Sequence, residues 1–203
     1  EVAVHCRNHA DATTGTLTVA LGSQRVETDL ALPTGTTTEQ VTLSLTPDRW
    51  RLSDPTLYTV TARLKAPECR DEMRERVGFR TIEITDEDIQ LNGSSVNIRG
   101  VNRHEDHPEW GHAQPLRIQE LDLNAIERAG LNTIRTSHYP VHPRLLDLCD
   151  ERGLLVLEEI PFWQFDAERF DRPGVLDRGT AMLREMIERD RSHPSPIAWS
   201  LTN

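Results

Sequence analysis

Polar side chains that could do chemistry gather at four places in the second half of the chain. Each group follows a short apolar run, and together they supply imidazole, guanidinium, carboxylate, amide and indole groups, in segments 102–108, 135–140, 158–163 and 200–203. If the apolar runs are parallel strands, their carboxyl ends meet at one edge and these side chains converge. Such a set suits a polyhydroxylated ring, because hydroxyls need directional hydrogen bonds and the C–H face of a sugar stacks on aromatics.

Two other functions remain open from the residues alone. A metal-dependent hydrolase could use the imidazole and carboxylate cluster His104, Glu105, Asp106, His107 and His112, although its spacing does not match a helical His-x-x-x-His zinc pair. A non-catalytic carbohydrate-binding or scaffold module is the other alternative. It does not explain polar residues at four successive strand ends, so the pattern favours an active site.

The elements that would position these groups alternate between strand and helix from residue 86 to 203. The strand markers Ile98, Ile134, Val156 and Ile197 recur about every 33 residues, and a (β/α)8 barrel averages about 31 residues per unit. Helices are expected over 116–129, 143–152 and 175–191. A doubly wound sheet usually carries a glycine-rich loop after its first strand, and none is present here. The sequence therefore predicts the first four strands of a (β/α)8 TIM barrel.

Residues 1–85 have a different texture, with apolar and polar residues alternating at period two. Threonine and valine dominate, and both residue types suit a half-buried strand. Strands are expected at 2–6, 17–21, 41–45, 57–64 and 77–82. About seven short strands with turn signals between them predict an immunoglobulin-like β-sandwich. The expected domains are thus 1–85 and 86–203, with a hairpin turn at Asn92-Gly93 near the start of the second.

Composition excludes several protein classes. The net charge of −10 argues against a nucleic-acid or anionic-membrane surface. No apolar run is long enough to cross a membrane as a helix. The cysteines Cys6, Cys69 and Cys149 are too few and too scattered for a disulfide framework or a zinc site. Both chain ends look like cuts through a longer protein, so localisation cannot be read from the N-terminus. A cytoplasmic location is the favoured expectation.

Several motifs together resemble glycoside hydrolase family 2, which holds β-galactosidases, β-glucuronidases and β-mannosidases. The motifs are Trp50–Tyr58, Gly78–Arg80, Gly100–Asp106, Ile134–Pro140, Leu148–Val156, Arg189–Pro194 and Trp199–Asn203. The resemblance implies a retaining mechanism with two glutamates about 5–5.5 Å apart. It places the acid/base glutamate immediately after Asn203 and the nucleophile later still, so neither catalytic carboxylate is expected within the chain. A β-galactosidase is ranked first and a β-glucuronidase second.

The same resemblance assigns substrate-binding roles residue by residue. His104 and His138 match histidines that line the sugar subsite, and Asn203 matches the asparagine that bonds the 2-hydroxyl. Arg135 matches the arginine that keeps the nucleophile carboxylate ionised. Glu159 matches an acidic position whose role varies across the family.

Trp163 is either a stacking platform for the sugar or a rim residue packed under a loop. No metal ligand or cofactor is expected: Pro161-Phe162-Trp163-Gln164 replaces the Glu-x-His pair of large β-galactosidases, so magnesium or sodium binding is unsupported. The expected partner is a β-linked oligosaccharide or glycoside. An oligomer is also expected, because unpaired edges of a half barrel favour association.

Overall fold

The computed structural model describes residues 1–203 and divides into two compact units. We name them the sandwich unit (Glu1–Asp48 and Tyr58–Val77) and the α/β unit (Arg49–Leu57 and Gly78–Asn203). None of the helices has the length and apolar character needed to cross a membrane. The predicted boundary between residues 85 and 86 stays a prediction.

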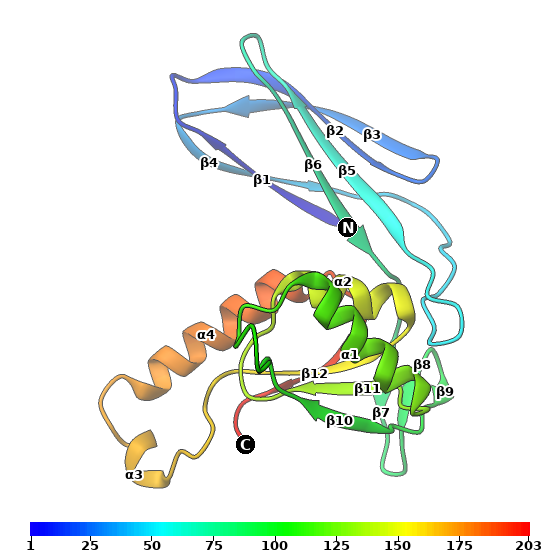
Figure 1. Ribbon diagram of the computed structural model, residues 1–203. Helices are drawn as coiled ribbons and strands as arrows, with labels where there is room; N and C mark the ends of the chain where they lie inside the picture. The colour runs from blue at the N-terminus through cyan, green and yellow to red at the C-terminus, as the bar shows by residue number, and fades with distance from the viewer. The chain divides into compact units, whose positions relative to one another are not determined.

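Two antiparallel sheets form the sandwich unit (Figure 1). One pairs β1 (Val2–Asn8) with β4 (Gly35–Val41), and the other has the order β3 (Gln24–Leu32), β2 (Thr13–Leu21), β5 (Tyr58–Lys65), β6 (Arg70–Val77). Inward-facing residues of both sheets share one core, made of Cys6, Leu17, Val19, Leu30, Leu32 and Val41. Period-two alternation thus places one apolar face of each sheet against the other.

Two of the expected strands are wrong. The 41–45 strand is absent, because β4 ends at Val41 and no regular strand follows before residue 58. The 77–82 strand is split: Val77 ends β6, and Ile82 begins β7. Phe79 lies between them and accepts a hydrogen bond from the Trp50 main-chain nitrogen (2.8 Å). Residues 1–85 therefore hold seven strands, as expected, of which β1 to β6 form the sandwich unit and β7 belongs to the α/β unit.

The α/β unit contains a small antiparallel sheet of β7 (Ile82–Ile84), β8 (Ile89–Leu91) and β9 (Ser94–Ser95). Asn92 and Gly93 join β8 to β9 and both have positive φ, 54° and 76°. These are the dihedrals that a tight two-residue hairpin turn requires, so the predicted Asn-Gly turn is confirmed.

A parallel sheet of four strands follows, and helices pack on it (Figure 1). Its order is β10 (Gly100–Arg103), β11 (Thr133–Thr136), β12 (Leu155–Glu159), β13 (Pro196–Ser200). The intervening helices are α1 (Leu116–Arg128), α2 (Pro143–Arg152), α3 (Ala167–Phe170) and α4 (Val175–Asp190). The three expected helices are confirmed, and the short α3 was not expected. The marker of the first expected strand, Ile98, lies outside that strand, because β10 begins at Gly100.

Helix α2 shows how local sequence sets an element's ends. The His142 side chain accepts a hydrogen bond from the Arg144 main-chain nitrogen, and Pro143 occupies the first turn. Gly153 ends the helix in the left-handed region with φ 67°. Between these caps, Leu145, Leu146 and Cys149 are fully buried in the core shared with α1, β11 and β12.

Trp50 anchors the segment Arg49–Leu57 in the α/β unit. Its side chain is fully buried, and its indole nitrogen donates to the carbonyl oxygen of Asp150 in α2 (2.8 Å). It packs with Leu91 and Leu155. Arg80 adds a second tie, because its guanidinium donates to the carbonyl oxygens of Pro194 and Pro196.

Candidate active site

Glu159 is the centre of the polar groups at the carboxyl ends of the parallel strands. Its side chain is completely buried at the end of β12. Oε2 accepts from Arg135 Nε (3.0 Å) and Nη2 (2.5 Å) and from Ser200 Oγ (2.6 Å), while Oε1 bonds His138 Nδ1 (2.5 Å). These bonds link residues from β11, β12, β13 and the loop after β11 around one carboxylate.

The surroundings keep this buried carboxylate ionised. Burial alone would raise the pKa of Glu159, but the hydrogen bonds from Ser200, His138 and Arg135 and the charge of Arg135 lower it on balance. A buried anion with donors on both oxygens is held in one geometry, since any rotation would leave a charge unpaired. Glu159 therefore fixes the orientation of the side chains around it.

Arg135, which Glu159 holds in place, also bonds Asn203 and so orients its side-chain amide. Its Nη2 donates to Asn203 Oδ1 (2.9 Å), and its Nη1 donates to Asn102 Oδ1 (3.4 Å). Because Oδ1 of Asn203 is engaged, the amide Nδ2 is the group available to donate to a ligand. Asn203 is exposed, so that group can meet one.

Aromatic contacts extend the cluster beyond Glu159. The ring of His138 is stacked on Trp163, with centroids 5.8 Å apart and planes at 17°, and meets His104 edge-on at 5.5 Å. The bond from Glu159 to Nδ1 leaves Nε2 as the outer nitrogen of His138. Trp163 is 46% exposed.

The six predicted site residues thus form one connected set: His104, Arg135, His138, Glu159, Trp163 and Asn203. Sequence reasoning did not assign site roles to Ser200 and Asn102, which bond Glu159 and Arg135. Both stand at predicted strand ends, and that position was the available signal.

Three side chains of the alternative metal cluster, Glu105, His107 and His112, have protein partners in the structure. Glu105 pairs with Arg103 (3.5 Å), His107 accepts from the Glu109 main-chain nitrogen (3.2 Å), and His112 packs edge-on against Tyr139. The structure gathers a different set of possible metal ligands, Asp147, Asp150 and His193, whose ligand atoms lie within 4.8 Å of one another.

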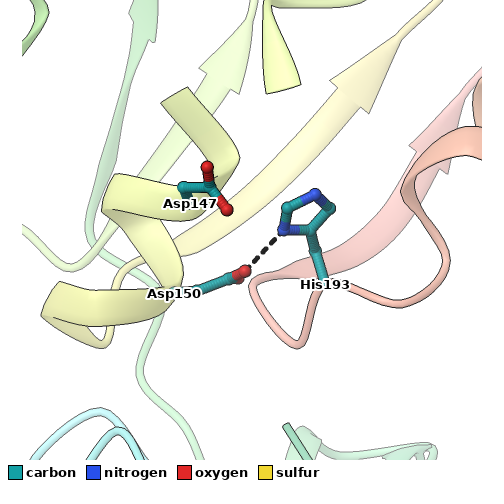
Figure 2. A group of neighbouring side chains, drawn as sticks. All are labelled: Asp147, Asp150 and His193. Atoms are coloured by element: carbon teal, nitrogen blue, oxygen red, sulfur yellow. Dashed lines mark hydrogen bonds and ion pairs between the residues drawn. The ribbon is translucent and has the colours of Figure 1, made fainter. Parts of the chain in front are cut away.

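Figure 2 shows that set, with Asp147 and Asp150 on α2 and His193 before β13. His193 Nδ1 bonds Asp150 Oδ2 (2.5 Å), and Ser195 donates its main-chain N–H to Oδ1 (3.0 Å). Asp147 pairs with Arg144 (3.0 Å). Burial opposes the charged imidazole, but the bond to Asp150 and the nearby carboxylates raise the pKa of His193 on balance. Each side chain thus has a protein partner, which explains the cluster as a tie between α2 and the start of β13.

Glu158 faces the opposite side of β12 from Glu159, as strand alternation requires. It is buried beside Arg189 (3.3 Å) near the end of α4, and Asp190 is also buried there. Burial and the neighbouring Asp190 carboxylate raise the pKa of Glu158 to about 8. This carboxyl group belongs to the packing between the sheet and α4, away from the Glu159 cluster.

Sequence and structure comparisons identify the family. Residues 1–80 match the profile "Glycosyl hydrolases family 2", and residues 82–203 match "Glycosyl hydrolases family 2, TIM barrel domain". A β-galactosidase of Psychromonas ingrahamii is 39% identical over 77% of this chain, and one of Thermoanaerobacterium thermosulfurigenes is 40% identical over 75%. The chain spans only 16% and 21% of the lengths of these two relatives.

Solved structures agree with the sequence relatives. A GH2 β-galacturonidase from Eisenbergiella tayi bound to galacturonate has a TM-score of 0.90 and 34% identity, covering 97% of this chain and 36% of that one. Bacteroides uniformis β-glucuronidase 2, covalently bound to cyclophellitol-6-carboxylate aziridine, has a TM-score of 0.87 and 30% identity, covering 99% and 25%. The two units are therefore the immunoglobulin-like domain and a partial TIM barrel, and the chain belongs to glycoside hydrolase family 2.

Proposed function

We propose that the chain contributes the sugar-binding side of the active site in a retaining β-glycosidase, with both catalytic glutamates beyond residue 203. β-Galactosides are the first choice of substrate and β-glucuronides the second. The observation that carries the proposal is the convergence of the ends of β11, β12 and β13 on one buried, ionised carboxylate, Glu159, while β10 reaches Arg135 through Asn102. That carboxylate orients His138 and Arg135 while their outer groups face the edge where barrel enzymes bind substrate.

Each oriented group has a defined task in this proposal. Asn203 Nδ2 donates to a ring hydroxyl, in a contact that strengthens as the oxocarbenium-like transition state forms. His138 offers Nε2 to another hydroxyl, since Nδ1 is held by Glu159. Trp163 offers its exposed face to the C–H surface of the sugar. Arg135 supplies a positive charge beside the position where the nucleophile would lie.

The first test is activity of the 203-residue chain. We expect no hydrolysis of nitrophenyl β-glycosides, because loss of general acid/base assistance alone costs about 10²–10⁴-fold and the nucleophile would be missing as well. The complete hydrolase, with the chain continued past Asn203, should turn over the same substrates. Turnover proportional to the concentration of the pure short chain would contradict the proposal.

A comparison of substrates tests the choice of sugar. The complete hydrolase is assayed with nitrophenyl β-galactoside and nitrophenyl β-glucuronide, and a higher kcat/KM is expected for the galactoside. Binding of galactose without turnover of either glycoside would instead support the binding-module alternative. Activity that is lost on chelation would support the metal-dependent alternative.

A further inference from the structure

Phe162 makes a contact that only glycine permits. Its ring lies against Gly179, which is buried within α4. A Cβ added to Gly179 would overlap Cε2 of the ring and stand 2.5 Å from Cζ. Glycine inside a helix costs about 1 kcal/mol relative to alanine. The ring thus occupies the space that a side chain of α4 would otherwise fill.

The main chain of Phe162 holds residues that follow β13. Its carbonyl oxygen accepts from Thr202 Oγ1 (2.5 Å) and from the main-chain nitrogen of Asn203 (3.4 Å). The next residue along the chain, Trp163, stacks on His138. One residue therefore connects α4 to two of the proposed sugar contacts.

We propose that the contact between Phe162 and Gly179 is a positioning element for the active site, which sets the Trp163 ring over His138 and the Asn203 amide beside Arg135. The inference rests on the proposed function for its effect on catalysis. Phe162 itself touches no proposed sugar contact with its ring; it acts through its carbonyl oxygen and through its neighbour Trp163.

The surroundings of the ring allow it to move without unfolding the protein. Phe165 stacks on it (centroids 4.8 Å apart) and Phe170 meets it edge-on (5.6 Å). An apolar cavity of about 350 Å³ adjoins it, lined in part by Leu176, Leu183 and Leu201. A ring displaced from Gly179 can move along α4 into this space, which the helix also lines, and we expect it to carry the 162 carbonyl and Trp163 with it.

Gly179→Ala in the complete hydrolase is the primary test. We expect kcat/KM for a nitrophenyl β-glycoside to fall roughly tenfold to a hundredfold, since displacement of contact groups by about 1 Å has effects of this size. kcat should fall as well as KM rise, because the Asn203 contact strengthens in the transition state. The matched control is Ala181→Ser, which adds one heavy atom at an exposed site of the same helix and should leave kinetics unchanged. Normal kinetics in Gly179→Ala would overturn the inference.

A second substitution tests the mechanism of the loss. Phe162→Leu shortens the side chain that meets the added Cβ, so Gly179→Ala/Phe162→Leu should be more active than Gly179→Ala alone. A double variant no better than the single one would overturn the inference, because the added methyl group would then act by another route.

Amide hydrogen exchange separates this inference from the proposed function. Gly179→Ala should speed exchange across residues 160–165, and Ala181→Ser should not. If the complete wild-type protein hydrolyses no β-glycoside, the proposed function fails, but faster exchange still supports the positioning contact. Unchanged exchange overturns the contact whatever the activity.

Discussion

Glu158 and Glu159 are neighbours in one strand, yet the structure drives their carboxyl groups to opposite protonation states. Glu159 is buried among donors that lower its pKa on balance. Glu158 is buried beside another carboxylate, and its pKa rises to about 8. The alternation of a β-strand puts one group in the site and the other in the packing layer, so sequence adjacency says little about chemical role.

The raised pKa of Glu158 predicts a pH-dependent stability. The unfolded chain loses this proton near pH 4.5, whereas the folded protein keeps it until about pH 8. The free energy of unfolding should therefore fall as pH rises between these values, by at most about 1.4 kcal/mol per pH unit for one proton. In Glu158→Gln the decline should be shallower in urea unfolding between pH 5 and 8.

His193 adds its own share to this decline, because its pKa is also raised and its contribution is lost as pH rises from the ordinary histidine pKa toward the raised one. That share is present in both proteins and does not affect their difference. Glu188→Gln, at an exposed site of α4, is the control and should keep the wild-type slope. An unchanged slope in Glu158→Gln would contradict the assignment.

His138→Ala should lower both catalysis and stability. In the complete hydrolase we expect kcat/KM to fall about tenfold to a hundredfold, because one hydrogen-bonding partner of the sugar is lost. The free energy of unfolding should fall by about 1–3 kcal/mol, because Oε1 of the buried Glu159 loses its partner, and His9→Ala in the exposed loop after β1 serves as the control. A clearly lower melting temperature with normal kinetics would make His138 a packing residue.

The sequence predicted the members of the site better than their connections. Because the carboxyl ends of parallel strands lie at one edge of the sheet, the expected strand ends were enough to predict His138, Arg135 and Glu159 as members of the site. It did not predict that Arg135 would bind Glu159 with two nitrogens, since pairing depends on side-chain geometry across strands. The substrate-binding roles of the six residues stay predictions.

At the scale of elements, two helix-ending glycines allow a matched stability test. Gly130 follows α1 with φ 73° and Gly153 follows α2 with φ 67°. A Cβ at Gly130 would meet nothing within 4 Å, but one at Gly153 would overlap the carbonyl oxygen of Leu52. Gly130→Ala should cost about 1 kcal/mol for the left-handed backbone alone.

Gly153→Ala should cost at least about 1–3 kcal/mol more, because the main chain of the Arg49–Leu57 segment must shift. Chemical denaturation of the two variants gives the difference directly. Equal losses of stability in the two variants would mean that the main chain at Leu52 shifts at no energetic cost.

Capped helices were predictable, whereas strongly charged strands were not. Helix α2 has a proline start and a glycine end that can be read directly. Strand β6 consists mainly of charged residues with an exposed, weakly patterned surface, so its sequence resembles a loop. It forms because β5 supplies a pairing template along its whole length. Charged side chains also suit a strand at the edge of a sheet.

At the scale of the whole molecule, the parallel sheet leaves β10 and β13 each with one unpaired side. We predict that the 203-residue chain self-associates or has a loosely packed α/β unit, because open strand edges and their apolar surroundings favour pairing with another chain. Sedimentation velocity over a range of concentrations measures this. A compact monomer whose amides from β10 to β13 are strongly protected would contradict the prediction.

The buried Trp50 affects where a chimera that exchanges domains of this protein can be joined. The family profiles divide the chain between residues 80 and 82, yet Trp50 and its neighbours up to Leu57 are packed in the α/β unit. A chimera joined at that boundary would give the barrel half a foreign version of this segment, with Asp150 and Leu155 facing an unmatched surface. The exchangeable module is therefore discontinuous in sequence, and a successful graft must carry residues 49–57 along with everything from residue 78 onward.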